Sequence, residues 1–294
     1  MANSVSLVTK FLEILAEIYK LESKTAQLDA LTQSIDFVGA NTVKVMKMTT
    51  VGLGTYSRTG GYPAGDITAV WEALTLAAER GRAFSLDRMD NEESLGLILG
   101  NLIRAWMRDH VAPELDAYRF AEYASASGIS TVAGATLASG TVLAALDLAR
   151  ETMNDNEVPE EGRKLFISAE VLAYVEAAIT RSLANETSVE RRVRVMLDGM
   201  EINMVPSARF YTAITLDAGA TTGAGGYAQG AGKEINFMIL HPTAVLQPIK
   251  LNQVKYFSPE VNQLSDGHLW QYRLYHDAFV QPNHELGVYL HKKA

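Results

Sequence analysis

The sequence has no cysteine among its 294 residues, which excludes disulfide bonds, thiolate metal sites and cysteine nucleophiles. Positive charge is also scarce, because 26 lysines and arginines face 34 acidic residues, for a formal net charge of −8. A surface built to hold nucleic acid needs clustered cations that neutralise phosphates. The composition therefore predicts at most weak, non-specific contact with nucleic acid, and the missing thiols fit a reducing compartment.

Long apolar runs are absent as well. The best candidate for a membrane span, residues 132–146, is short and contains glycine, serine and threonine, whereas a span needs about 20 apolar residues. Residues 1–9 are polar to mixed in character and do not have the pattern of a signal or transit peptide. We expect a soluble protein without membrane contact.

The common short motifs of enzymes are missing too. The sequence contains no GxxxxGK[ST] phosphate loop, no HExxH zinc motif and no GxSxG nucleophile elbow. Five of the six histidines lie in the last 54 residues, but their spacing is not that of converging metal ligands. Ser265, Asp266 and His268 are neighbours on one predicted turn, so they cannot form a hydrolase triad. We predict no catalytic residue, no metal and no cofactor.

One glycine-rich tract, residues 218–232, requires a separate interpretation. Gly223, Gly225 and Ala228 match the spacing of a dinucleotide-binding fingerprint. The fingerprint needs a following helix whose N-terminus meets the pyrophosphate, yet residues 233–240 have the pattern of a strand. We interpret the tract as a flexible surface loop. A nucleotide-binding enzyme that uses this loop is kept as an alternative from another functional class.

The N-terminal region carries a narrow apolar seam. Its apolar side chains recur at alternating spacings of four and three residues, the period of a one-faced helix, at Leu7, Phe11, Ile14, Ile18, Leu21, Leu28 and Ile35. Such a seam must be covered, either by the core of the chain itself or by a neighbouring subunit. Periodicity does not distinguish these two alternatives.

A long β-hairpin is predicted next. Residues 43–51 and 67–76 alternate with the two-residue period of strands, and the glycine-rich residues 52–65 join them. Because an isolated two-stranded hairpin is only marginally stable in water, a long one needs a partner surface. Residues 82–86 then predict a short strand.

Residues 90–125 predict the longest helix. Asp90 and Glu93 have the spacing of a capping box, and apolar residues follow at three- and four-residue intervals as far as Ser125. At 1.5 Å per residue this helix would be about 50 Å long. Pro113 cannot donate to the carbonyl of Asp109, so we expect a bend near residues 109–113.

After residue 128 helices and strands alternate, which is typical of an α/β or α+β unit. We predict one helix at residues 141–153 with Thr141 as N-cap, and a second that Ser168 caps and that runs to about residue 183. A hairpin should join residues 189–197 to 201–205 across the turn Asp198-Gly199. Within it, a basic cluster fits a solvated strand face better than DNA readout: Arg191, Arg192 and Arg194. Further strands are predicted at residues 164–167, 233–240, 249–257, 268–280 and 287–291, with a helical turn at 242–246.

In this order the elements resemble the major capsid protein of tailed bacteriophages of the Hong Kong 97 type. Similar stretches are GDITAVWEALTLAAERGRAFSLDRMDNEES at 65–94, APELDAYRFAEYAS at 112–125, INFMILHPTAVLQPIK at 235–250 and YRLYHDAFV at 272–280. The resemblance spans nearly the whole chain. It implies an α+β fold with an N-arm, an extended β-hairpin loop, a long spine helix in a peripheral domain and an α/β axial domain.

The resemblance also assigns a role to each part of the chain. The N-arm would be residues 1–40, and the peripheral domain residues 41–133, including the extended loop 48–76 and the spine helix 90–125. The axial domain would comprise residues 134–240 and finish with 277–294, while 241–276 would return to the peripheral domain as strands. Contacts between subunits are expected from the arm and the extended loop, at Leu7, Phe11, Ile14, Ile18, Tyr56, Arg58, Tyr62 and Trp71.

The implied function is assembly and not catalysis. Pentamers and hexamers of this chain would form the icosahedral head of a virion, assembled in the host bacterial cytoplasm around double-stranded DNA. A separate scaffolding protein, a portal and decoration proteins are the implied partners, since no long N-terminal scaffold segment is present. Some capsids of this type cross-link the extended loop through a lysine. Residues 48–71 contain none, and Arg58 is their only cation, so no such bond is expected. An encapsulin-like nanocompartment is the nearest alternative.

Overall fold

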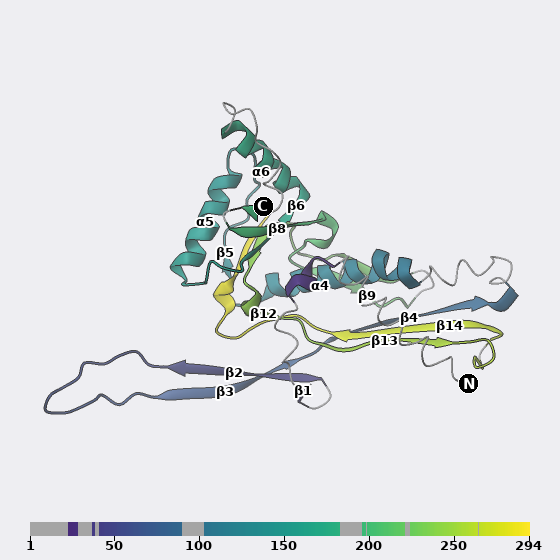
Figure 1. The fold of residues 1–294 in the computed structure, drawn as a ribbon, viewed down its shortest axis with the longest axis horizontal. Coiled ribbons are helices and arrows are strands. Elements are labelled where there is room, and N and C mark those ends of the chain that lie inside the picture. Colours follow the sequence, from purple (N-terminus) through teal and green to yellow (C-terminus); the bar gives the residue numbers. More distant parts are fainter. Residues whose placement is uncertain are drawn as a thin grey trace.

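A computed structural model of the chain describes residues 23–28, 37–38, 41–89, 103–182, 196–197, 199–220, 224–263 and 265–294. The α+β class is confirmed. Figure 1 shows an upper body of helices and sheet, a long narrow sheet beneath helix α4 (Ala112–Ser125), and a hairpin that projects in the opposite direction. Within these ranges no helix is both long and apolar enough to cross a membrane.

The upper body is built on a six-stranded sheet. Its strand order is β5 (Ser130–Thr131), β16 (Val288–Lys292), β11 (Ile235–Leu240), β6 (Lys164–Ser168), β8 (Met200–Val205) and β7 (Met196–Leu197). Helices α5 (Val142–Asp155) and α6 (Ala169–Ser182) pack on one face, and α4 contributes Phe120 and Tyr123 to the core on the other. Every residue of β11 is buried, as expected of a strand that is covered on both faces.

The long sheet has the order β13 (Ile249–Phe257), β14 (Gly267–His276), β4 (Ala78–Asp87). Its inner face packs Trp270, Tyr272 and Leu274 against Met107 and Leu115 of the helical segment above. The predicted strand 82–86 is the middle of the longer β4. The predicted strand 268–280 is interrupted, because β14 ends at His276 and β15 (Phe279–Val280) pairs instead with β12 (Val245–Leu246). A 3₁₀ turn, Pro242–Ala244, precedes β12, so the predicted helical turn there is shorter than expected.

The long helix is described from residue 103 onward, and its predicted capping box, Asp90 and Glu93, lies outside the described residues. Near Pro113 the helix changes to a π-helical turn, Met107–Val111, in which the Ala112 N–H donates to the Met107 carbonyl. Proline has no N–H to offer to the turn before it, and a single π-turn widens the helix at this place. The bend expected near residues 109–113 stays a prediction.

Local signals in the upper body give a mixed result. Ser168 caps α6 as predicted, because its Oγ accepts the Val171 N–H at 3.4 Å. Thr141 precedes α5, but its hydroxyl bonds back to the N–H and C=O of Ala138, so its predicted capping bond is not made. The β7–β8 hairpin is present, with Gly199 at φ 79° in its turn. Residues 189–195, with the three clustered arginines, and Asp198 lie outside the described residues.

The projecting hairpin is formed by β2 (Thr42–Thr50) and β3 (Ile67–Thr75), which pair antiparallel along their whole length. Both strands agree with the prediction to within one residue. A short strand, β1 (Phe37–Val38), pairs with the base of β2. Beyond this base the hairpin extends away from the rest of the molecule (Figure 1).

Candidate assembly surfaces

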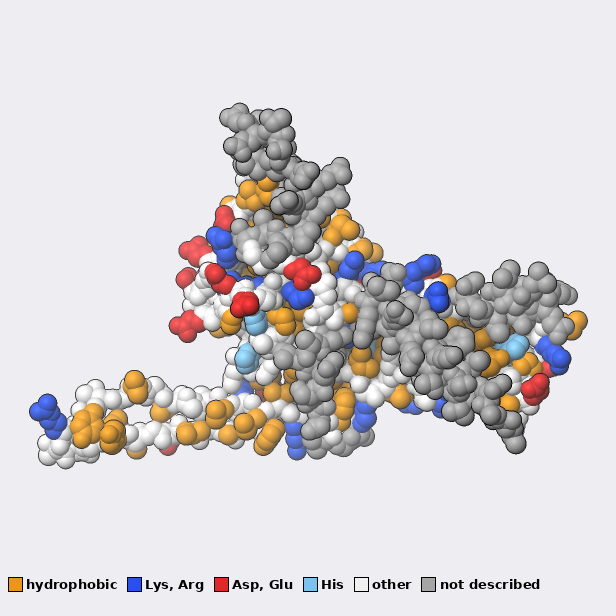
Figure 2. Space-filling view, in the orientation of Figure 1, with side chains coloured by type: hydrophobic (Ala, Val, Ile, Leu, Met, Phe, Trp, Pro, Cys, Tyr) orange, Lys and Arg blue, Asp and Glu red, His pale blue; other side chains and the backbone are white. Residues whose placement is uncertain are grey.

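One face of the hairpin is apolar and open to solvent. In the antiparallel register Met46 lies opposite Trp71, and Thr50 lies opposite Ile67, so side chains of both strands share this face. Ile67 and Trp71 are 73% and 63% exposed. We define the apolar face of the hairpin as Met46, Met48, Ile67 and Trp71. Figure 2 shows hydrophobic side chains along the projecting hairpin and at its end. A stripe of this kind marks an interaction site in most proteins.

The opposite face of the hairpin has a different character. Lys47 and Glu72 lie on it, as do Thr49 and Thr68 nearer the tip. Val70 is the large apolar side chain that this face exposes. The outer part of the hairpin is thus two-sided, with one face suited to burial against another surface and the other more polar. Nearer the base the division ends, because Val43 lies on the polar side and Lys44 on the apolar side.

The tip of the hairpin is ordered although it is exposed. Ser57 and Gly61 exchange two backbone hydrogen bonds, of 3.1 and 2.7 Å, and the Ser57 hydroxyl accepts the N–H groups of residues 59 and 60. The rings of Tyr56 and Tyr62 lie 4.9 Å apart. Arg58 therefore sits at the apex of a closed turn flanked by two aromatic rings.

The predicted contact residues fall into two groups. Tyr56, Arg58 and Tyr62 are exposed at the tip, and Trp71 lies on the apolar face. The four residues of the arm lie outside the described residues: Leu7, Phe11, Ile14 and Ile18. Sequence reasoning missed Met46, Met48 and Ile67. Aligning the alternation of the two strands across their connection would have placed these beside Trp71.

The root of the hairpin, where β3 passes into β4 at Leu76 and Ala77, is held by side chains from residues 275–283. Asp277 accepts the Ala77 N–H through Oδ2 at 2.7 Å, and the Tyr275 hydroxyl donates to the Leu76 carbonyl at 2.9 Å. Further along, the Asn283 amide donates to the Met48 carbonyl at 3.1 Å. We call Leu76 and Ala77, with their bonds to Tyr275 and Asp277, the hairpin root.

A second polar node fixes residues 23–28 to α4. Asp116 is fully buried and accepts the Ser23 hydroxyl at 2.7 Å and both the N–H and the hydroxyl of Thr25. It also accepts the Lys24 N–H and pairs with Arg209 at 3.3 Å. Leu28 enters the core between α4 and the six-stranded sheet. Residues 23–28 are thus held against α4 by both polar and apolar contacts.

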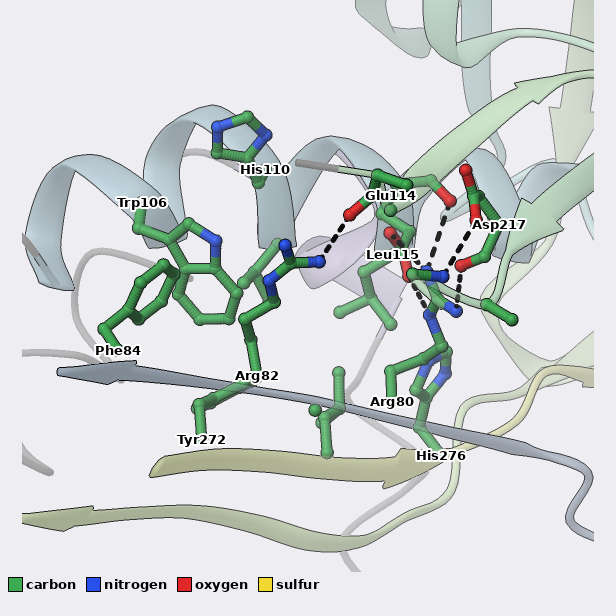
Figure 3. A pocket seen from close by; sticks show the side chains of 18 residues that line it. Arg80, Arg82, Phe84, Trp106, His110, Glu114, Leu115, Asp217, Tyr272 and His276 are labelled. Atoms are coloured by element: carbon green, nitrogen blue, oxygen red, sulfur yellow. Dashed lines mark hydrogen bonds and ion pairs between the residues drawn. The ribbon is translucent and has the colours of Figure 1, made fainter. Parts of the chain in front are cut away.

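The glycine-rich tract corrects a prediction, because the described part of residues 218–232 is not a free loop. Gly226–Gln229 forms β10 and pairs with β9 (Ile214–Asp217). Arg80 donates to the carbonyls of Asp217 and Gly226 and pairs with Glu114 at 2.5 Å, while Arg82 donates to the Ala224 carbonyl (Figure 3). Two arginines of β4 thus hold the tract, more than 130 residues away in sequence, and Arg80 also connects it to α4 through Glu114. Local composition carries no signal of this.

The space beneath the tract is a pocket of about 280 Å³. Phe84, Trp106 and Tyr272 form its aromatic wall, with ring centroids 5.2 Å apart in edge-to-face pairs (Figure 3). The guanidinium groups within it already bond to protein oxygens. The dinucleotide interpretation gains no support here, because the tract continues into strands and Gly223 lies outside the described residues.

Four titratable groups with shifted pKa values lie where α4 meets the hairpin root. Burial raises the pKa of Asp277, and burial together with the charge of Asp277 raises that of Glu122. Burial, with the nearby carboxylates, also raises the pKa of the Tyr118 hydroxyl, which donates to Asp277 at 3.0 Å. Burial, with the positive charges of Arg119 and Arg80, lowers the pKa of His276 to about 3. All four shifts follow from packing several segments against one helix.

The other C-terminal histidines serve local structure. His241 bonds to Thr243, His291 bonds to Asn236, and His268 bonds to the Tyr256 hydroxyl. Among the residues that the structure describes, no group of three or more His, Cys, Asp or Glu side chains is placed to hold a metal ion. His284 lies at the turn before the last strand.

The long hairpin, the spine helix and the mixed sheet together define a capsid-type fold, and solved capsid structures match it over most of their length. The capsid of the cyanophage P-SCSP1u is 13% identical, with 88% of this chain and 85% of that chain covered and a TM-score of 0.59. The mature capsid of bacteriophage PhiM1 is 12% identical, with coverages of 87% and 82% and a TM-score of 0.54. A virus-like particle from Pyrococcus furiosus is 8% identical, with coverages of 95% and 96% and a TM-score of 0.54.

These likenesses confirm the predicted fold class. The chain has the fold of phage capsid proteins, of the Hong Kong 97 type. No protein-family model matches the sequence, and no curated protein is similar to it in sequence. At such low identity the fold is what the comparisons establish.

Proposed function

We propose that this chain is a major capsid protein whose copies assemble as pentamers and hexamers into the icosahedral head of a tailed bacteriophage, around double-stranded DNA. The observation that carries the proposal is the apolar face of the hairpin, on which Met46, Met48, Ile67 and Trp71 are each more than half exposed. Copies of one chain can cover such a face through repeated symmetric contacts.

The size of this effect is large enough to offset a substantial part of the cost of association. Burying a large apolar side chain contributes about 1.5–3 kcal/mol, so the exposed portions of these four contribute roughly 1–2 kcal/mol each. One hairpin then offers several kcal/mol, which is comparable with the stability of a domain. In a closed shell every copy would place its own hairpin on one neighbour and would receive the hairpin of another.

The fold also supports a division of the chain into domains. We propose that residues 41–133 and 241–276 form the peripheral domain, with 48–76 as the extended loop and 90–125 as the spine helix. Residues 134–240 and 277–294 form the axial domain around the capsomer centres, and residues 1–40 form an arm that reaches a neighbour. A scaffolding protein, a portal and decoration proteins are the expected partners. The net charge of −8 fits weak, non-specific contact with the enclosed DNA.

An encapsulin-like nanocompartment is the second candidate, because one solved structure with this fold is a virus-like particle from Pyrococcus furiosus and not a phage capsid. The contents of particles purified from the native source separate the two. Double-stranded DNA of uniform length supports the virion head, whereas a protein cargo without DNA supports the nanocompartment.

Deleting the ordered tip tests the assembly function itself. A variant in which residues 52–65 are replaced by a two-residue turn keeps β2 and β3 but loses Tyr56, Arg58 and Tyr62. We expect free capsomers or irregular aggregates by electron microscopy, with a circular dichroism spectrum close to that of the native chain. Closed shells at normal yield from this variant contradict the proposed role of the hairpin.

A further inference from the structure

The hairpin leaves the body at one junction, and Asp277 is central to it. Its Oδ2 accepts the Ala77 N–H at 2.7 Å, on the segment that links β3 to β4. Its Oδ1 accepts the Ala278 N–H at 2.8 Å and the Tyr118 hydroxyl of α4 at 3.0 Å. One carboxylate therefore joins the hairpin root, the end of β14 and the spine helix.

The environment makes this node rigid. Asp277 is 2% exposed, so water does not compete effectively for its oxygens. All three of its partners are hydrogen-bond donors. The two oxygens of a carboxylate can accept all three bonds, whereas an amide has only one oxygen to accept them. The Asp277 N–H is itself fixed by the Pro248 carbonyl at 3.1 Å. Rotation of the hairpin about its root would break at least one of these bonds.

The rest of the hairpin has few other ties. Beyond the root, the Asn283–Met48 bond and the short strand β1 connect it to the body among the described residues. Among the described residues, the direction of this long ribbon is therefore set by the bonds at its root together with the Asn283–Met48 bond on β2. A small rotation at Ala77 displaces the tip by a large distance.

We propose that Asp277 is a positioning residue that fixes the direction in which the hairpin leaves the body. Resting on the proposed function, the same residue then determines where on a neighbouring copy the apolar face lands, and so the regularity of the shell. Asp277 makes no contact with a neighbour in this role. It acts through the backbone of Ala77.

Hydrogen–deuterium exchange on the full chain tests the first part, with Asp277→Ala compared with Asp116→Ala. Both variants remove a buried carboxylate, Asp277 packed against α4 and Asp116 within it, but Asp116 holds residues 23–25 and not the hairpin. We expect Asp277→Ala to speed exchange about ten- to a hundredfold in peptides covering residues 67–80, with residues 23–28 near the native rate. Asp116→Ala should give the opposite pattern. Equal acceleration of both segments by Asp277→Ala, or native exchange at the root, overturns the proposal.

A gentler variant decides the matter if Asp277→Ala does not fold. Tyr118→Phe removes only the hydroxyl that holds Asp277 Oδ1. It should speed exchange at residues 74–80 severalfold while the unfolding midpoint stays close to native. Unchanged exchange at the root in this variant contradicts the positioning role.

Electron microscopy of the assembly products tests the second part. We expect Asp277→Ala to yield fewer closed particles, with more open or irregular ones, under conditions in which the native chain closes. Regular shells from a variant with a loosened root refute the link to shell geometry. If the native chain itself forms no particles, the proposed function fails, while the exchange result still decides the role of Asp277.

Discussion

Two adjacent residues of β3 provide a matched test of the two-sided hairpin. Ile67 lies on the apolar face, and Thr68 lies on the opposite face. Substituting either with lysine adds the same charge at nearly the same distance from the tip. Because both side chains are exposed, neither change should alter the free energy of unfolding of the free chain by more than about 0.5 kcal/mol.

Their effects on assembly should differ. Ile67 is 73% exposed, so covering it at a contact contributes about 1–2 kcal/mol. Losing 2 kcal/mol per subunit raises the concentration of free subunits at equilibrium about thirtyfold, and the cost of burying the lysine charge adds to this. Thr68→Lys keeps the apolar face intact and should change that concentration less than threefold, a margin of roughly 0.6 kcal/mol.

Sedimentation velocity over a series of protein concentrations measures the free-subunit concentration directly. The reasoning is refuted if Ile67→Lys and Thr68→Lys assemble equally well. It is also refuted if Ile67→Lys unfolds at a markedly lower urea concentration, because Ile67 would then be part of the internal core of the chain.

Three further predictions concern Asp116, the glycine-rich tract and His276. Asp116→Ala should lower the free energy of unfolding by about 3 kcal/mol, because it removes the buried carboxylate that pairs with Arg209 and accepts the hydroxyls of Ser23 and Thr25. Urea unfolding measures this free energy, and a loss below 1 kcal/mol contradicts the prediction. In thermal unfolding, Gly225→Ala should destabilise the chain by about 1 kcal/mol more than Gly226→Ala does. Both glycines have positive φ, but of the two only a Cβ at residue 225 meets Arg82, at 2.7 Å. Equal losses of stability contradict the role of Arg82 in holding the glycine-rich tract. The pKa of His276 is about 3 in the folded chain and about 6.5 in the unfolded chain, so its protonation favours unfolding as the pH falls below 6.5, by about 2 kcal/mol at pH 5. His276→Gln should therefore lose less stability than the native chain between pH 7 and pH 5. An identical loss contradicts the lowered pKa of His276.

Strong local periodicity made several elements predictable. Residues 249–257 were predicted as a strand with the bounds that β13 has, and both strands of the hairpin were placed to within one residue. In these segments side-chain alternation, turn residues and burial all agree, so tertiary contacts do not override the local pattern.

The failures occur where distant residues decide the structure. The glycine-rich tract was predicted to be flexible, but Arg80 and Arg82 hold it to β4. The continuous strand 268–280 was wrong because Asp277 turns away to bond Ala77, two hundred residues earlier in the chain. Of the apolar face, only Trp71 was predicted from the sequence. Met46, Met48 and Ile67 lie beside it because of the pairing register of β2 and β3, which neither strand shows alone.

Analytical sedimentation of the purified native chain, followed by electron microscopy of the fast fraction, tests the central claim most directly. We predict closed shells of many copies, in which the apolar face of each hairpin lies against a neighbouring subunit. A monomer at all concentrations, with Ile67 and Trp71 folded back onto its own body, would contradict the account.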